Sequence, residues 1–280
     1  MVESIPNNVS EVIEILKTGN CRIVAGATDF MVKNKKKSRD ELSKKRYILI
    51  SSIEDLKKIE VIENKLKIGA CATCSEIIDS PIVPQFIKDV IETMASPAIR
   101  NTATLGGNIC NASPVGDSLP LLYALEAKLL IASNKEEKLI PIEEFIKGPG
   151  KIILEEYELL KEIVINLSDF NKIYFKKVGT RNSIALAKLS FFGMAKINEN
   201  NGIEDIKLSF GAVAPTIVKN KNLEQKIVSL KTLTKEHVEE ILTNYRELIK
   251  PITDQRSDGY YREEVSLRLL RNFLLNIQDI

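Results

Sequence analysis

The first stretch whose residue types suit ligand binding is AGATDF, at residues 25–30. Gly26 and Ala27 leave the backbone exposed directly after a short apolar run, so successive N–H groups of a turn there could surround a phosphate. Thr28 adds a hydroxyl donor. The stretch is neither a G-x-G-x-x-G fingerprint nor a Walker motif. A plain tight turn is the simpler interpretation when the stretch is considered alone.

A second stretch, TLGGNICNASPVGD at residues 104–117, carries more chemistry. Gly106 and Gly107 can adopt positive φ and admit close approach of a ligand to a loop backbone. Asp117 is an acceptor suited to sugar-like hydroxyls. Neutral donors and acceptors come from Thr104, Asn108, Asn111 and Ser113. This set suits a pyrophosphate and a polyol better than a metal, which prefers clustered carboxylates or imidazoles. An Ω-loop leading into a helix is the alternative.

Histidine and cysteine chemistry is largely excluded, and we predict no metal site in this chain. His237 is the only histidine, which leaves no HExxH site, no histidine-based zinc cluster and no simple Ser-His-Asp triad. Cys71 and Cys74 form a C-x-x-C pair, but no second pair follows at zinc-finger spacing. A redox role for that pair is the alternative to small buried cysteines. The simplest carrier of redox chemistry is therefore a bound organic cofactor.

The composition is that of an ordinary globular protein: 280 residues, 44% hydrophobic, 28% charged, with a formal net charge of +2. No global field favours nucleic acid or a membrane surface. The sequence shows no signal peptide and no apolar run of membrane-spanning length. We therefore expect a cytoplasmic protein that inserts in no membrane and binds no nucleic acid. The basic run KNKKKSRDELSKKR, residues 33–46, is expected to be a solvated face rather than an anion-binding patch.

Apolar periodicity predicts a mixed α and β first part. Helices are expected at residues 9–17 and, with a break near Pro81 and Pro84, at 74–95. Strands are expected at 21–26, 46–51 and 65–70, with a short turn or helix and a strand pair between the last two. The stretch 104–117 is expected to be a loop. The run PLLYALEAKLLIA is expected to begin as a helix and end as a strand.

A composition shift near residue 170 marks a second part. Three successive strands are expected at residues 173–178, 186–197 and 206–215, with a hairpin turn at Asn201–Gly202. The start of the middle strand could instead be helical. Helices are expected at 223–230, 234–248 and 260–277. These patterns predict an α+β protein with two domains, residues 1–169 and 170–280.

The two small-residue stretches together resemble the FAD-binding subunit of the molybdenum hydroxylases, the xanthine dehydrogenase and carbon monoxide dehydrogenase flavoprotein family. In that family the first stretch reads like AGGTDL and the second like TIGGNIANASPIGD. Further similar segments are GPGKIILEEYELLKEIVI, YFKKVGTRNSIALAKLS, FGAVAPT and PITDQRSDGYYREEVSLRLLRNFL, so the likeness covers nearly the whole chain. Ala27 replaces the usual glycine, which implies either a negative φ there or room for a methyl group.

The resemblance implies a PCMH-type FAD-binding domain of two subdomains over residues 1–169. A smaller domain of the dehydrogenase flavoprotein type, with a three-stranded antiparallel sheet and C-terminal helices, would follow over 170–280. It also implies that backbone groups of both stretches cradle the FAD diphosphate and approach the flavin. The residues concerned are Ala25, Gly26, Ala27, Thr28, Asp29, Thr104, Leu105, Gly106, Gly107 and Asn108.

Four further residues gain roles from the resemblance. Ser113 and Asp117 would contact the adenosine and ribityl region, and Leu160 would pack beside the isoalloxazine ring. Lys177 would lie near the polar edge of the flavin, where a cation favours the reduced, anionic form. Lys176 is the alternative, because the register is open by one residue.

The function implied is that of the FAD-binding subunit of a molybdopterin-dependent dehydrogenase. A molybdopterin-binding partner chain would hydroxylate the substrate, and a partner with [2Fe-2S] clusters would pass electrons to FAD in this chain. NAD⁺ or another acceptor would then be reduced. A free-standing FAD-dependent oxidoreductase and a non-catalytic flavin-binding assembly module are the alternatives.

Overall fold

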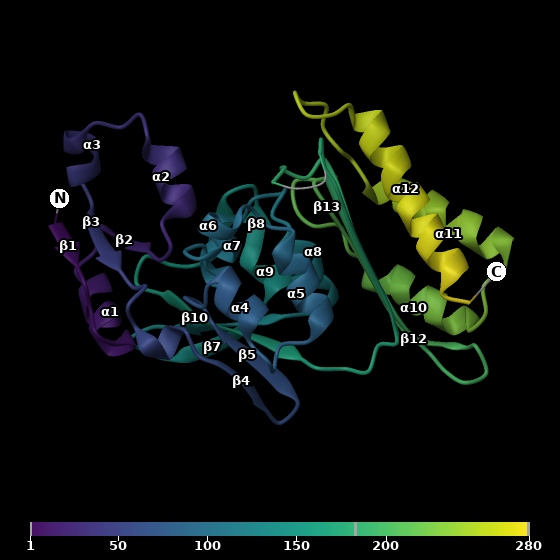
Figure 1. Cartoon of the computed structure of the whole chain (residues 1–280), viewed down its shortest axis with the longest axis horizontal. Coiled ribbons are helices and arrows are strands. Elements are labelled where there is room, and N and C mark those ends of the chain that lie inside the picture. The colour runs from purple at the N-terminus through teal and green to yellow at the C-terminus, as the bar shows by residue number, and fades with distance from the viewer. Residues whose placement is uncertain (1, 182–183, 279–280) are drawn as a thin grey trace. The chain divides into compact units, whose positions relative to one another are not determined.

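Within the computed structural model, which describes residues 2–181 and 184–278, the strands form four sheets. The chain divides into two units, each with its own core (Figure 1). The first comprises Met1–Ala112 and Glu126–Leu167, and the second comprises Ser113–Leu125 and Ser168–Ile280. The second unit thus includes a short segment from the middle of the first. The boundary at residues 169 and 170 stays a prediction.

The first unit begins with a small parallel sheet of order β1-β3-β2. Its strands are β1 (Val2–Ser4), β2 (Cys21–Val24) and β3 (Arg46–Leu49). Helix α1 (Val9–Leu16) packs Val12 and Leu16 into the same apolar cluster as Ile48 and Ile50. It starts at Asn8, whose side chain accepts from the N–H of Glu11. Helices α2 (Thr28–Asn34) and α3 (Arg39–Ser43) connect β2 to β3.

A second sheet of the first unit is antiparallel, with the order β4-β5-β10-β6-β7. Its strands are β4 (Ile59–Ile62), β5 (Lys65–Gly69), β6 (Lys128–Ala132), β7 (Glu137–Pro141) and β10 (Leu159–Asn166). The helical elements of this part are η1 (Glu54–Leu56), α4 (Cys74–Asp79), α5 (Gln85–Glu92), α6 (Pro97–Arg100), α7 (Leu105–Asn111) and α9 (Ile142–Phe145). A hairpin of β8 (Ile146–Gly148) and β9 (Lys151–Ile152) precedes β10.

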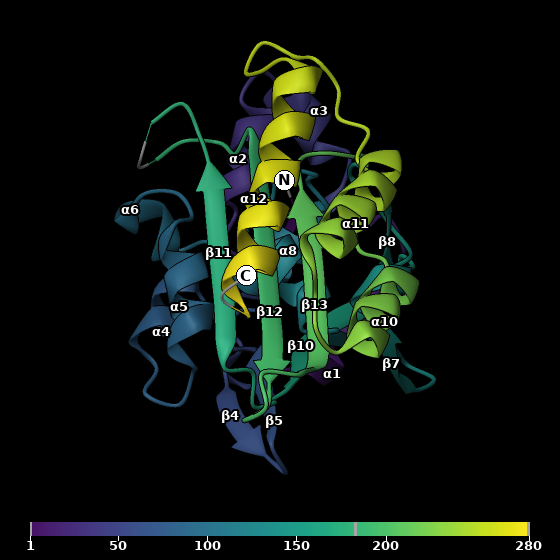
Figure 2. The same ribbon diagram turned by 90° about the vertical axis from the view of Figure 1, so that its right-hand side faces the viewer.

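The second unit is built on an antiparallel sheet of order β11-β12-β13. Its elements are α8 (Ser118–Ala124), β11 (Lys172–Val178), β12 (Leu189–Ile197), β13 (Ile203–Gly211), α10 (Lys221–Leu230), α11 (Lys235–Leu248) and α12 (Gly259–Asn276). Figure 2 shows α12 lying along the face of this sheet, with α10 and α11 beside β13.

Strand β12 is buried on both faces because helices cover each of them. Phe191 points toward the C-terminal helices, where its ring lies 4.9 Å from Phe210 and 5.8 Å from Phe273. On the other face Ser209 of β13 donates to the backbone O of Pro120, in α8. Residues of opposite parity on a strand point to opposite faces, so the sheet requires apolar residues at nearly every position of β12.

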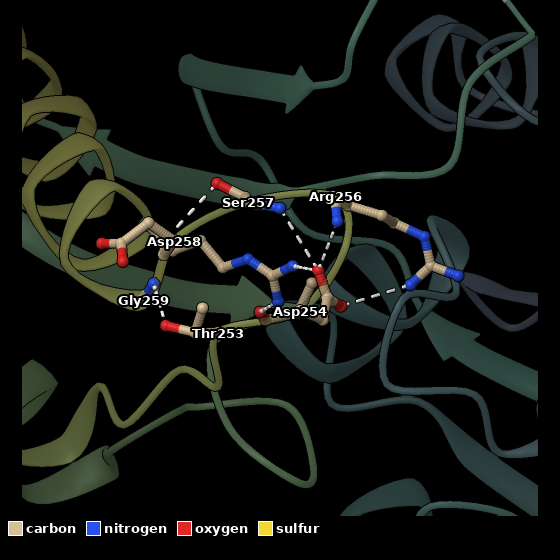
Figure 3. A network of polar contacts seen from close by, with 8 residues as sticks. Thr253, Asp254, Arg256, Ser257, Asp258 and Gly259 are labelled. Atoms are coloured by element: carbon tan, nitrogen blue, oxygen red, sulfur yellow. Dashed lines mark hydrogen bonds and ion pairs between the residues drawn. The ribbon is translucent and has the colours of Figure 1, made fainter.

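The start of α12 is fixed by a polar turn (Figure 3). The Asp254 carboxylate accepts from the N–H groups of Arg256 and Ser257, and Asp258 caps the helix. The N–H of Gly259 donates to the Thr253 hydroxyl at 2.9 Å.

Arg262 anchors this turn from one helical turn further on. Only 2% of Arg262 is exposed, and its guanidinium lies 2.5 Å from Asp254 and 3.5 Å from the carbonyl O of Ala212. The turn is therefore tied to the end of β13.

The α+β class, the mixed first part and the three-stranded antiparallel sheet with C-terminal helices are confirmed. The helix break at Pro81 and Pro84 is present between α4 and α5, and Asn201 has φ of 61° in the β12–β13 turn. The middle strand has no helical start, since the residues before Leu189 are not helical. The prediction that residues 104–117 form a loop was wrong, because α7 lies within them.

Candidate cofactor site

The first unit contains a cavity of about 430 Å³ at the place where the two small-residue stretches meet. From the first stretch it is lined by Ala25, Gly26, Ala27, Thr28 and Asp29, and from the second by Thr104, Gly106, Gly107 and Asn108. Leu160, at the start of β10, lines it too. The structure therefore brings most of the predicted site residues together. Leu105 is buried at 2% exposure behind this surface.

The first stretch is a turn between β2 and α2 with unpaired donors. Ala27 has φ of 58°, which rules out the negative φ and leaves the other alternative, room for a methyl group. No side chain caps α2. The first turn of a helix has no intrahelical acceptor for its N–H groups. The described part of the chain records no hydrogen bond for the N–H groups of Thr28, Asp29 and Phe30. These donors are available to a ligand in the cavity.

Gly26 explains how the two stretches come together. A Cβ on Gly26 would lie 1.7 Å from the carbonyl O of Thr102, two residues before the second stretch. A glycine is required because the two backbones pack directly on each other.

The second stretch differs from its expected form. Thr104 caps α7, and the N–H groups of the helix start are already bonded: Leu105 to Ala72 O, Gly106 to Ala70 O and Gly107 to Thr104 Oγ1. Neither glycine has a positive φ. The prediction that this stretch offers bare amides was therefore wrong.

The two glycines of α7 have different roles, and only Gly106 serves the packing of the helix. A Cβ on Gly106 would lie 2.6 Å from that of Ala70, so the glycine lets α7 approach the end of β5. Gly107 is exposed and leaves the surface of α7 open toward the cavity.

Three of the predicted site residues belong to the second unit: Ser113, Asp117 and Lys177. Two of them are in contact, since Lys177 Nζ lies 2.6 Å from Asp117 Oδ2. Lys176, the alternative lysine, is exposed. Burial raises the pKa of the Asp117 carboxyl, and the Lys177 ammonium opposes that rise. Among the described residues Asp117 Oδ1 has no hydrogen-bond partner.

Cys21 and Cys110 line the cavity, whereas the C-x-x-C pair and the histidine are not among the described residues that do. Burial raises the pKa of the Cys71 thiol to about 12 and that of Cys74 to about 11, so both stay protonated and unreactive at neutral pH. This disfavours the redox interpretation of the C-x-x-C pair. His237 accepts through Nδ1 from the N–H of Thr234 in the cap of α11. Residues 2–181 and 184–278 contain no cluster of three or more metal-ligating side chains.

Sequence reasoning assigned no role to several charged residues of the cavity. Lys33, Glu155, Glu156 and Glu158 line it. Lys33 lies four residues after Asp29, a spacing that brings two side chains together on a helix. That spacing was the available signal. The glutamates follow the β9 strand with no pattern that would distinguish them from a solvated face.

Two family models match the chain and together cover most of it. "FAD binding domain in molybdopterin dehydrogenase" matches residues 4–167, and "CO dehydrogenase flavoprotein C-terminal domain" matches residues 174–277. In the described residues no helix is long and apolar enough to cross a bilayer.

Individual relatives agree with the family models. The glyceraldehyde dehydrogenase medium chain of Sulfolobus acidocaldarius is 30% identical over 224 residues, which are 78% of each chain. A putative xanthine dehydrogenase FAD-binding subunit of Escherichia coli is 28% identical over 213 residues, 73% of this chain and 70% of that one.

The fold has a close counterpart among solved structures. A carbon monoxide dehydrogenase chain of Hydrogenophaga pseudoflava superposes with a TM-score of 0.89 at 22% identity, covering 99% of this chain and 96% of that one. The family models, the relatives and the fold agree. The chain belongs to the family of FAD-binding subunits of the molybdenum hydroxylases, the oxidoreductases that include xanthine and carbon monoxide dehydrogenases.

Proposed function

We propose that this chain holds FAD in the cavity of its first unit and serves as the flavin subunit of a molybdopterin-dependent dehydrogenase. In this proposal a molybdopterin-binding partner oxidises the substrate, and a partner with [2Fe-2S] clusters delivers the electrons. They leave this chain for NAD⁺ or another acceptor. The observation that carries the proposal is that both small-residue stretches line one cavity.

The residues present fit a flavin nucleotide. The unpaired N–H groups of Thr28, Asp29 and Phe30 are donors suited to phosphate oxygens. Gly107 is exposed and leaves its part of the cavity wall without a side chain. The cavity volume of about 430 Å³ lies within the range of roughly 300 to 1,000 Å³ found for small-molecule sites.

The chain's own residues would bind and orient this ligand. The turn at residues 26–30 would hold its phosphates, and the apolar side chain of Leu160 would contact its ring system. When bound, a flavin supplies the electron and hydride chemistry of the complex. Ser113, Asp117 and Lys177 belong to the proposal on the resemblance to the family, with Lys177 at the polar edge of the ring.

The direct test is a titration of the purified full-length chain with FAD, followed by flavin absorbance and fluorescence. We expect saturable uptake of one FAD per chain and a yellow protein. A chain that takes up none of the added FAD while remaining folded by circular dichroism would overturn the proposal.

The complex is tested separately, by purification from the native host. Molybdenum and iron that co-purify in fixed ratio with this chain would support the subunit role. A flavin-loaded chain that runs alone and turns over a substrate would favour the free-standing oxidoreductase, and one that runs alone without turnover would favour the assembly module. Reduction of the complex by NADH, compared with reduction of artificial dyes, identifies the acceptor class.

A further inference from the structure

Lys33 joins the two stretches that form the cavity. Its Nζ lies 2.8 Å from the Asp29 carboxylate, in the first stretch, and donates to Asn111 Oδ1, at the end of α7 in the second. All three residues line the cavity. Lys33 therefore lies at the cavity wall where the two stretches are linked by side chains.

The charges around the cavity make a cation there important. The described lining includes four carboxylates, on Asp29, Glu155, Glu156 and Glu158, and two cations. The Arg22 guanidinium is one of the two and lies 5.5 Å from the centre of the Phe30 ring. A phosphate entering among carboxylates is repelled unless a cation offsets them.

The present partners of Lys33 leave it able to bind such a phosphate. The side chains of Lys33 and Asp29 are 52% and 46% exposed, and ion pairs this exposed contribute little stability. An ammonium group has three N–H donors. Lys33 Nζ can therefore keep its hydrogen bond to Asn111 while it redirects one N–H from Asp29 to a ligand.

We propose that Lys33 is the side chain that recognises phosphate in this site and makes it select phosphorylated flavins over uncharged riboflavin. This inference rests on the proposed function, since it places the flavin nucleotide in the same cavity. Lys33 opens the basic run of residues 33–46, so one member of that run binds an anion while its exposed neighbours are solvated.

The test compares Lys33→Ala with Lys35→Ala in the full-length chain. Both variants remove one positive charge from an exposed lysine at the end of α2, but Lys33 lines the cavity and Lys35 does not. Binding of FAD, FMN and riboflavin is measured by flavin fluorescence, with FAD titrations repeated at several salt concentrations. Circular dichroism melts confirm that each variant is folded.

We expect Lys33→Ala to weaken FAD binding by about ten-fold and to flatten its salt dependence, because a charge-assisted contact to phosphate is lost. Riboflavin binding should not change, Lys35→Ala should bind FAD like the wild type, and Lys33→Arg should restore most of the affinity. Equal losses for FAD and riboflavin in Lys33→Ala would show that Lys33 only holds the two stretches together. Equal FAD affinities and salt slopes in the two alanine variants would also overturn the inference.

The failure of the proposed function gives a different result. In that case the wild-type chain itself binds no FAD. The inference about Lys33 fails when the wild type binds FAD and Lys33→Ala binds it as tightly.

Discussion

Lys177 Nζ lies 2.6 Å from Asp117 Oδ2, and this contact joins strand β11 to the residue that precedes α8. The two side chains are only 12% and 11% exposed. A pair this well buried responds to mutation differently from a surface pair, because removing one partner leaves the other charge poorly solvated.

At neutral pH Lys177→Met should destabilise the chain by about 2 kcal/mol, since it leaves the buried Asp117 carboxylate without its counter-charge. The measurement is urea unfolding followed by circular dichroism. Lys196→Met is the matched control, because the Lys196–Glu204 pair of the same sheet is roughly half-exposed. This control should change stability by less than about 0.5 kcal/mol. Equal effects of the two variants would contradict a buried, interdependent pair.

The same variant has a defined pH signature. Burial raises the pKa of Asp117 above its ordinary value of 3.8, so the folded chain holds this proton to higher pH than the unfolded chain. Stability contributed by the protonated form is therefore lost as pH rises from 3.8 through the raised pKa. Because Lys177 opposes the rise in the Asp117 pKa, this loss should be larger in Lys177→Met. The stability difference between the two chains should therefore grow over that acidic window and stay constant above it.

With Lys177 at the polar edge of the ring, as proposed, Lys177→Ala should lower the reduction potential of bound FAD by about 30 mV, because a cation there favours the reduced, anionic form. FAD affinity should change less than the potential. The measurement is a spectroelectrochemical titration of the flavin-loaded chain. Lys176→Ala is the control, since Lys176 is exposed on the same strand. A shift of equal size in Lys176→Ala would show that the role does not belong to Lys177 specifically.

Gly26 and Gly107 should behave differently when each is replaced. Gly26→Ala places a Cβ 1.7 Å from the Thr102 carbonyl O, so it should lower the melting temperature markedly. Gly107→Val should leave the chain folded, because Gly107 has helical backbone and an added Cβ meets one atom within 4 Å, the Thr104 hydroxyl at 2.8 Å, which must shift. It should nevertheless weaken FAD binding, since it fills the cavity wall. FAD titration and thermal melts of both variants check this; unchanged FAD affinity in Gly107→Val would remove α7 from the site.

Arg262→Met should destabilise the second unit by about 2 kcal/mol, because the buried guanidinium holds Asp254 and the Ala212 carbonyl. Arg256→Met is the control, as Arg256 is exposed and meets Asp254 only at 3.5 Å. Hydrogen bonding to Arg262 lowers the pKa of Asp254, so its contribution is present at neutral pH and is lost as pH falls below 3.8. Thermal melts at pH 7 and pH 3 should show the difference between the variants shrinking in acid.

The sequence alone determined the α+β class, most helix and strand positions and the two stretches that meet at the cavity. Apolar periodicity sets which face of an element is buried, and Gly, Asn and Pro mark the turns, as at Pro81, Pro84 and Asn201. The resemblance carried by AGATDF and TLGGNICNASPVGD indicates the family without reference to tertiary structure.

Tertiary structure decided how those stretches work. Gly106 was expected to expose its backbone to a ligand. Its N–H is instead bonded to Ala70 O, and the missing side chain lets α7 pack closely against Ala70. A glycine codes equally for a flexible loop and for a tight contact, and only the neighbouring backbone distinguishes the two. The unpaired donors lie instead after Ala27, and Lys33 reaches Asn111 across 78 residues of sequence. Such contacts depend on how distant segments pack, which no local pattern encodes.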